Sequence, residues 1–283
     1  MDFTLWAVYN NTVKTAARTG RTVWGGSARS MIYDLQKANM WKRISAFLFD
    51  GILLGILAVL FAWLLSMVLH YDRWNDTLND AYARYGEEYG VAFDISLSEY
   101  EALSPEELDQ LNAAYQAVGE DAEAVRAYNV LIQLTLVITS FSLLAACLCL
   151  EFFVPMKLGG GRTLGKKIFG LGLMRTEGIK VSNVSLFIRA ILGKYAIELM
   201  IPVLIVLMIY WGTIGIVGPI VLGLILIVQL VVIITTRTNS LIHDLMADTV
   251  VIDYASQMIF DSREEMIAFK EKAHKEAVAR QTY

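Results

Sequence analysis

The chain has 283 residues, of which 56% are hydrophobic and 18% are charged. Soluble domains carry about 25% charged and about 45–50% apolar residues, so this composition excludes an ordinary soluble domain and indicates a membrane protein. The formal net charge of -4 excludes little by itself, because the charges are distributed unevenly along the chain.

Residues 1–40 are predicted to form cytoplasmic amphipathic helices that lie along the membrane surface. Phe3, Trp6 and Val13 form a loose apolar stripe, and Lys14 and Arg18 lie outside it. This is the pattern of an interfacial helix on an anionic leaflet. A flexible basic tail is the alternative interpretation of the same residues.

Long apolar runs predict four transmembrane helices, each long enough to cross a hydrocarbon core of about 30 Å. The first occupies residues 41–71 and the second occupies residues 128–156. Residues 196–236 are too long for one crossing and are interrupted by glycines and Pro219, so they are predicted to hold the third and fourth. Residues 157–195 are predicted to form a basic, glycine-rich cytoplasmic loop followed by an amphipathic helix. Residues 237–283 are predicted to form a cytoplasmic segment containing His243-Asp244 and then a charged helix.

Residues 72–127 form an acidic insert between the first two spans, with fourteen acidic residues against three arginines. Ser104-Pro-Glu-Glu107 is typical of a helix start, because serine caps the helix, proline suits its first position and glutamate completes a capping box. That helix is predicted to end near Gly119. We expect the insert to be a small helical cap.

Basic residues are concentrated on one side of the predicted spans, as Arg43, Lys157 and Arg237 illustrate, whereas acidic residues outnumber the arginines on the other side. The positive-inside rule therefore predicts that both termini are cytoplasmic and that the acidic insert is extracytoplasmic.

Charged residues near the cytoplasmic ends of the spans are predicted to converge on one cluster. A carboxylate such as Asp50 costs about 2.5–3.5 kcal/mol in mid-membrane, so the chain is expected to supply a partner or a wet cavity. In one interpretation the cluster is a static ion-pair network. In the other, Asp50 and Asp244 bind protons or small cations on a transport path, and His243 titrates near neutral pH. The cluster comprises Arg43, Asp50, Glu151, Arg189, Lys194, Glu198, His243 and Asp244.

The loop from Gly160 to Lys167 is close to a phosphate-binding P-loop, but Lys167 stands where the motif requires serine or threonine. We instead expect Arg162, Lys166 and Lys167 to contact lipid head groups. The sequence contains no catalytic constellation and no zinc spacing. We therefore expect no enzyme activity, no cofactor and no bound metal.

The chain resembles the RDD family of bacterial membrane proteins in four ordered motifs. The family's arginine and two aspartates correspond to Arg43, Asp50 and Asp244. The resemblance implies a multi-pass protein of the bacterial cell membrane. It also implies transport, since some members have been proposed as sodium/proton antiporters. The acidic insert is larger than expected for a minimal member. The motifs are Arg43-x-x-Ala46-x-x-x-Asp50, Gly161-x-Thr163-x-Gly165-Lys166-x-x-x-Gly170-Leu171, Arg189, and His243-Asp244-x-x-Ala247-x-Thr249-x-Val251.

These observations predict an all-α membrane protein with four transmembrane helices, amphipathic surface helices and a helical acidic extracytoplasmic insert. Its expected function is cation/proton exchange, in which Arg43 and Arg189 hold Asp50 and Asp244 in place. The expected partners are the lipid bilayer, small cations and protons, with no nucleic acid. Four spans make a thin bundle, so transport would require a homo-oligomer. The alternative functions are a non-transporting scaffold or sensor that binds proteins, and lipid handling at the inner leaflet.

Overall fold

A computed structural model of the chain describes residues 38–236 and 238–281. The predicted surface helices fall almost wholly in residues 1–37, which lie outside the described residues, as does Arg237. Four helical segments of the described chain are long and apolar enough to cross a membrane, in agreement with the predicted all-α class. They are Met40–Val68, Ala122–Leu158, Asn183–Tyr210 and Val217–Thr235.

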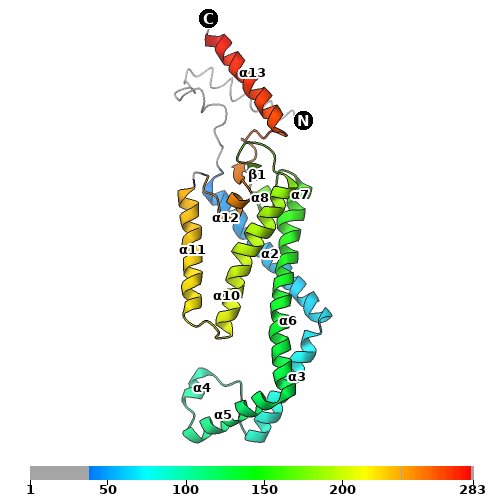
Figure 1. Cartoon of the computed structure of the whole chain (residues 1–283), viewed down its shortest axis with the longest axis vertical. Coiled ribbons are helices and arrows are strands. Elements are labelled where there is room, and N and C mark those ends of the chain that lie inside the picture. Colours follow the sequence, from blue (N-terminus) through cyan, green and yellow to red (C-terminus); the bar gives the residue numbers. More distant parts are fainter. Residues whose placement is uncertain (1–37, 237, 282–283) are drawn as a thin grey trace. The chain divides into compact units, whose positions relative to one another are not determined.

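The chain divides into two units, and the first contains residues up to Leu54 together with those from Cys147 onward. It begins with the first half of helix α2 (Met40–Val68). After the second span come the short helix α8 (Leu164–Ile168), the third span, and α11 (Val217–Thr235), which packs against α10 (Ile201–Tyr210) (Figure 1). Helix α12 (Ile242–Met246) and the C-terminal α13 (Arg263–Gln281) complete its helices.

The second and third spans each contain a stretch of π-helix. The second span runs through α6 (Ala122–Cys147), η1 (Leu148–Phe153) and α7 (Val154–Leu158). The third runs through α9 (Asn183–Phe187), η2 (Ile188–Met200) and α10 without interruption. The amphipathic helix predicted before residue 196 and the third span are therefore parts of one continuous helical segment. The charged residues of that segment face the protein and not the lipid, which is why they do not end the span.

A two-stranded antiparallel sheet, absent from the sequence prediction, joins two loops of this unit. Strand β1 (Leu171–Arg175) pairs with β2 (Thr249–Asp253), and Leu173 lies opposite Val251. Four of the five residues in each strand are buried. The sheet fixes the loop that precedes β1 and the turn of α12 that precedes β2, and both carry residues of the site described below.

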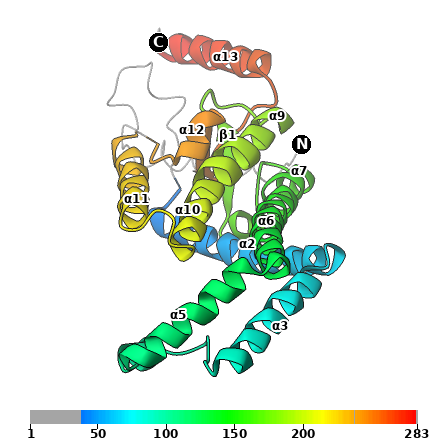
Figure 2. The same cartoon turned by 60° about the horizontal axis from the view of Figure 1, so that its bottom comes forward.

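The second unit, residues 55–146, contains the acidic insert. Helices α3 (Tyr71–Tyr89) and α5 (Pro105–Glu120) lie side by side (Figure 2), and the segment that connects them in the chain contains the short α4 (Leu97–Glu101). Ser104 and Glu107 form the capping box that the sequence predicts. Ala81, Val118 and Ala124 form a small core, so the insert is a folded helical structure.

Candidate functional site

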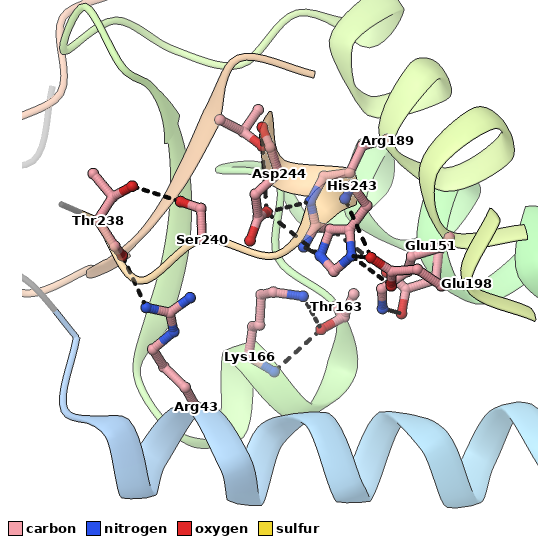
Figure 3. Close-up of polar contacts among 12 residues, drawn as sticks. Arg43, Glu151, Thr163, Lys166, Arg189, Glu198, Thr238, Ser240, His243 and Asp244 are labelled. Atoms are coloured by element: carbon pink, nitrogen blue, oxygen red, sulfur yellow. Dashed lines mark hydrogen bonds and ion pairs between the residues drawn. The ribbon is translucent and has the colours of Figure 1, made fainter. Parts of the chain in front are cut away.

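Charged side chains from five segments of the first unit gather in one cluster (Figure 3). All eight residues predicted for it belong to this unit, and Lys166 joins them. Asp50 and Lys166 are each 7% exposed, and Glu151, Arg189, His243 and Asp244 are at most 2% exposed. We call these nine residues the charged cluster: Arg43, Asp50, Glu151, Lys166, Arg189, Lys194, Glu198, His243 and Asp244.

Arg189 is the central residue of the charged cluster. Its Nε donates to Oδ1 of Asp244 at 2.9 Å, and its Nη2 lies 2.8 Å from Nε2 of His243. Its third nitrogen, Nη1, lies 3.6 Å from Oε2 of Glu151. One guanidinium therefore connects η1, η2 and α12. The predicted pairing of Arg189 with Asp244 is present.

The π-helical geometry of η2 explains how Arg189, Lys194 and Glu198 reach the same cluster. Residues nine apart lie about 180° apart around an α-helix, which turns about 100° per residue. A π-helix has i→i+5 hydrogen bonds and roughly 4.4 residues per turn, so the same residues return to within about 20° of one another. Arg189 and Glu198 are nine apart and Lys194 lies between them. Regular α-helix would direct Glu198 away from Arg189.

Lys194 and Glu198 each interact with one further residue of the charged cluster. The Lys194 ammonium forms a short ion pair with Oε1 of Glu151. The Glu198 carboxylate lies 2.7 Å from Nδ1 of His243. Because Arg189 can only donate, Nε2 of His243 must accept, and the ring is therefore neutral with its proton on Nδ1. Burial, together with the charge of Arg189, lowers the pKa of His243 despite its acidic neighbours. The predicted titration of His243 near neutral pH is thus disfavoured.

Gly193 allows α12 to approach η2. A Cβ at this position would lie 2.6 Å from the Cα of His243 and closer still to its Cβ. Any larger residue would therefore move α12, and with it His243 and Asp244, away from Arg189.

Asp50 has partners that the sequence did not indicate. Its Oδ2 accepts a 2.5 Å hydrogen bond from the Thr163 hydroxyl, and its Oδ1 accepts a 2.7 Å bond from the backbone N–H of Gly165. A Cβ on Gly165 would lie 2.5 Å from the carbonyl oxygen of Ala46, so glycine is needed for this approach. The glycine-rich loop that resembles a P-loop therefore binds a carboxylate of its own chain.

Arg43 does not hold Asp50, so the predicted pairing is wrong. Its guanidinium donates instead to the carbonyl oxygens of Thr238, at 3.2 Å, and Asn239, at 2.7 Å. These carbonyls follow the end of α11, and Arg43 therefore ties the start of α2 to that loop. Arg43 and Asp50 are seven residues apart on one helix, but their side chains form hydrogen bonds with different partners.

Lys166 is buried, which contradicts its predicted contact with lipid head groups. Its Nζ lies 3.3 Å from Oγ1 of Thr163, and its side chain lies between α2 and the residues of α12 (Figure 3). Arg162 stacks on Tyr254 at 4.1 Å and donates to the carbonyls of Leu158 and Gly159. Of the three basic residues predicted to contact lipid, Lys167 alone is classed as exposed.

A cavity of about 70 Å³ lies within the charged cluster. Asp50, Lys166 and Asp244 line it, with Arg43 and Lys194 beside them. Apolar side chains such as Phe47 and Leu241 complete its lining. A cavity of this size has room for several water molecules. Asp50 and Asp244 thus border one shared space, as expected from the sequence.

The formal charges of the cluster cancel when Lys166 is protonated. Four cations (Arg43, Lys166, Arg189 and Lys194) stand against four carboxylates (Asp50, Glu151, Glu198 and Asp244), and His243 is neutral. Burial raises the pKa of the Asp244 carboxyl, whereas the charge and the hydrogen bond of Arg189 lower it, and this pKa lies below its usual range. Within the described residues, no group of three or more His, Cys, Asp or Glu side chains is arranged to hold a metal ion.

No curated protein and no solved structure matches this chain. Residues 37–248 match the RDD family, and this range contains the complete charged cluster. The three residues that correspond to the family's arginine and two aspartates all lie in the cluster, although Arg43 and Asp50 do not bind each other. The chain is therefore a multi-pass membrane protein that belongs to the RDD family.

Proposed function

We propose that this protein exchanges small monovalent cations for protons across the membrane, with the charged cluster as its binding site. The observation that carries the proposal is the cavity of about 70 Å³ shared by Asp50, Lys166 and Asp244. A purely structural ion-pair network has no need of such a space. A site that receives a partly hydrated ion requires one.

The carboxylates on this cavity retain the capacity to bind a cation. Each carboxylate oxygen has two lone pairs, and each oxygen of Asp50 accepts one hydrogen bond from the described residues. The remaining lone pairs of Asp50, together with water in the cavity, provide oxygen atoms of the kind that alkali cations prefer. The bonds from Thr163 and Gly165 keep this carboxylate in place, and no cation of the described residues forms an ion pair with it.

The charge balance of the cluster favours exchange over uptake of a cation alone. An added cation would leave an uncompensated buried charge, which costs several kcal/mol. Loss of one proton as the cation enters keeps the formal charge of the cluster unchanged. We further propose that the cluster faces the cytoplasm of a cell membrane, since basic residues flank that side. A homo-oligomer would complete the path.

The test is ion flux in proteoliposomes that contain the purified full-length protein and an internal pH-sensitive dye. We expect an imposed sodium, potassium or lithium gradient to change the internal pH faster than in empty liposomes. Asp50→Asn should abolish this flux, whereas Asp80→Asn, on the exposed surface of α3, should leave it unchanged. A wild-type protein that moves no protons under any of these gradients would contradict the proposal.

A non-transporting scaffold or sensor is the second candidate, and one observation favours it. Glu151, Glu198 and Asp244 all have basic or histidine partners, as expected of a static network. In that case the wild-type protein would show no flux, and cross-linking in native membranes would recover a stoichiometric partner.

A further inference from the structure

Lys166 differs from the other three cations of the charged cluster in its partners. Arg189 and Lys194 form ion pairs with carboxylates, and Arg43 binds two backbone carbonyls. Within the described chain, no carboxylate oxygen lies within 4.0 Å of the Lys166 ammonium, and its one hydrogen bond is to the Thr163 hydroxyl. A buried ammonium with one hydrogen bond and no ion pair among the described residues is costly to keep charged.

The surroundings of Lys166 shift its titration into the neutral range. Burial, followed by the charge of Arg189, lowers the pKa of Lys166 to about 7, although Glu151 and Asp50 oppose the change. The charged and titratable groups around it come from four elements: Arg43 and Asp50 from α2, Glu151 from η1, Arg189 and Lys194 from η2, and His243 and Asp244 from α12.

The other groups on the cavity are poor carriers of an exchangeable proton. Both ring nitrogens of His243 are engaged, one by Glu198 and the other by Arg189. Asp244 is held ionised by Arg189. Arg43 has no carboxylate partner, but a guanidinium does not lose its proton in proteins. Among the described cations on this cavity, Lys166 is therefore the one that can release a proton without breaking an ion pair.

We propose that Lys166 is the proton-binding group of the site, and that its proton and a small cation exclude each other from the cavity. The inference rests on the proposed cation/proton exchange and assigns its proton to one atom, Nζ of Lys166. When a cation enters beside Asp50, the N–H bond of the ammonium breaks and the proton passes to water, which leaves a neutral amine. The formal charge of the cluster is the same before and after.

Thr163 links the two positions. Its hydroxyl donates to Asp50 and its oxygen accepts from the Lys166 ammonium. The glycine-rich loop therefore connects the group that binds the proton to the carboxylate beside which the cation enters.

The test measures sodium binding to the purified full-length protein in detergent, by titration calorimetry with NaCl against choline chloride. Simple competition with a group of pKa about 7 makes the apparent dissociation constant about tenfold weaker at pH 6 than at pH 9. Lys166→Met should make sodium affinity independent of pH. Lys166→Arg, which keeps a permanent charge, should abolish binding at both values. Lys167→Met, the exposed neighbour, should behave as the wild type.

Three outcomes would overturn the assignment: Lys166→Met with the pH dependence of the wild type, Lys166→Arg that binds sodium, or wild-type affinity that does not change with pH. If the variants do not fold, a pH dye in weakly buffered wild-type protein measures the protons that sodium releases. Sodium should release about one proton per site near pH 6 and almost none near pH 9, and equal release at both would refute the role of Lys166.

Flux measurements in proteoliposomes distinguish failure of the proposed transport from failure of the Lys166 assignment. Absent flux with pH-dependent binding refutes transport alone, and coupled flux in Lys166→Met refutes the assignment alone.

Discussion

Replacement of Arg189 by methionine is the sharpest test of how the charged cluster holds the fold together. The guanidinium is 3% exposed and contacts Asp244, His243 and Glu151, of which the two carboxylates are at most 2% exposed. Its loss leaves Asp244 with a buried, uncompensated charge. Removal of one partner from a buried ion pair typically costs about 3–5 kcal/mol. Total stabilities of about 5–15 kcal/mol make this a large fraction.

The assay is the free energy of unfolding in mixed micelles, followed by tryptophan fluorescence as SDS is added. Arg175→Met is the matched control, because Arg175 pairs with Asp248 at 3.1 Å with both side chains partly exposed. Exposed pairs contribute about 0–1 kcal/mol, so this variant should lose much less. The double variant Arg189→Met/Asp244→Leu should be less destabilised than the sum of its single variants. Equal losses for Arg189→Met and Arg175→Met would refute this account of the cluster.

Three further predictions concern the close contacts and the titration of the cluster. Gly193→Ala should cost about 1–3 kcal/mol by pushing His243 away, whereas Gly55→Ala, which has open space around it in α2, should cost nothing; equal melting temperatures for the two would contradict the packing. Asp50→Ala should cost about 3–5 kcal/mol, since it orphans two buried donors to a carboxylate, and a melting temperature within error of the wild type would count against those bonds. Lys166 has a pKa of about 7 when folded and 10.5 ordinarily, so the unfolded state binds more protons between these values and stability rises with pH there. Wild type should gain about 2 kcal/mol relative to Lys166→Met between pH 7 and pH 9, and a loss over this range would refute the sign.

The spans and the acidic insert follow from local sequence. A long run of apolar residues such as the one in α11 is unfavourable in water, and within a membrane only a helix or a closed barrel pairs all of its backbone polar groups. Hydropathy alone therefore identifies this run as a transmembrane helix. The start of α5 is equally local, because Ser104 and Glu107 satisfy donors within one turn of each other. Both features depend on neighbours in sequence, which is why they are predictable.

The π-helices and the sheet depend on tertiary structure and leave little trace in the sequence. The residues of η2 have no composition that distinguishes π-helix from α-helix, and the wider turn is stabilised by Arg189, Lys194 and Glu198 meeting their partners. Strands β1 and β2 are five residues each and lie more than seventy residues apart in the chain. Each is too short to show a period by itself.

Within the cluster, residue types were predictable and pairings were not. The similar depth expected for Asp50 and Asp244 predicted one cluster, because charged groups within a membrane seek partners, and both residues line one cavity. The depth of a residue in the membrane does not determine which atoms form its hydrogen bonds and ion pairs. Spacing on α2 favoured Arg43 as the partner of Asp50, but the backbone N–H of Gly165 is closer to that carboxylate. Lys166 seemed a surface residue because its neighbours are basic and glycine-rich. A motif that places Thr163, Gly165 and Lys166 together was the one available signal that the loop turns inward.

The central claim is that a charge-balanced cluster exchanges one cation for one proton. The most direct measurement is simultaneous recording of sodium uptake and proton release in the same proteoliposomes, with the membrane potential set by potassium and valinomycin. We predict equal and opposite fluxes whose rate does not change with the membrane potential, and loss of both fluxes in Asp50→Asn. Sodium uptake without proton release, or a rate that follows the potential, would contradict the account.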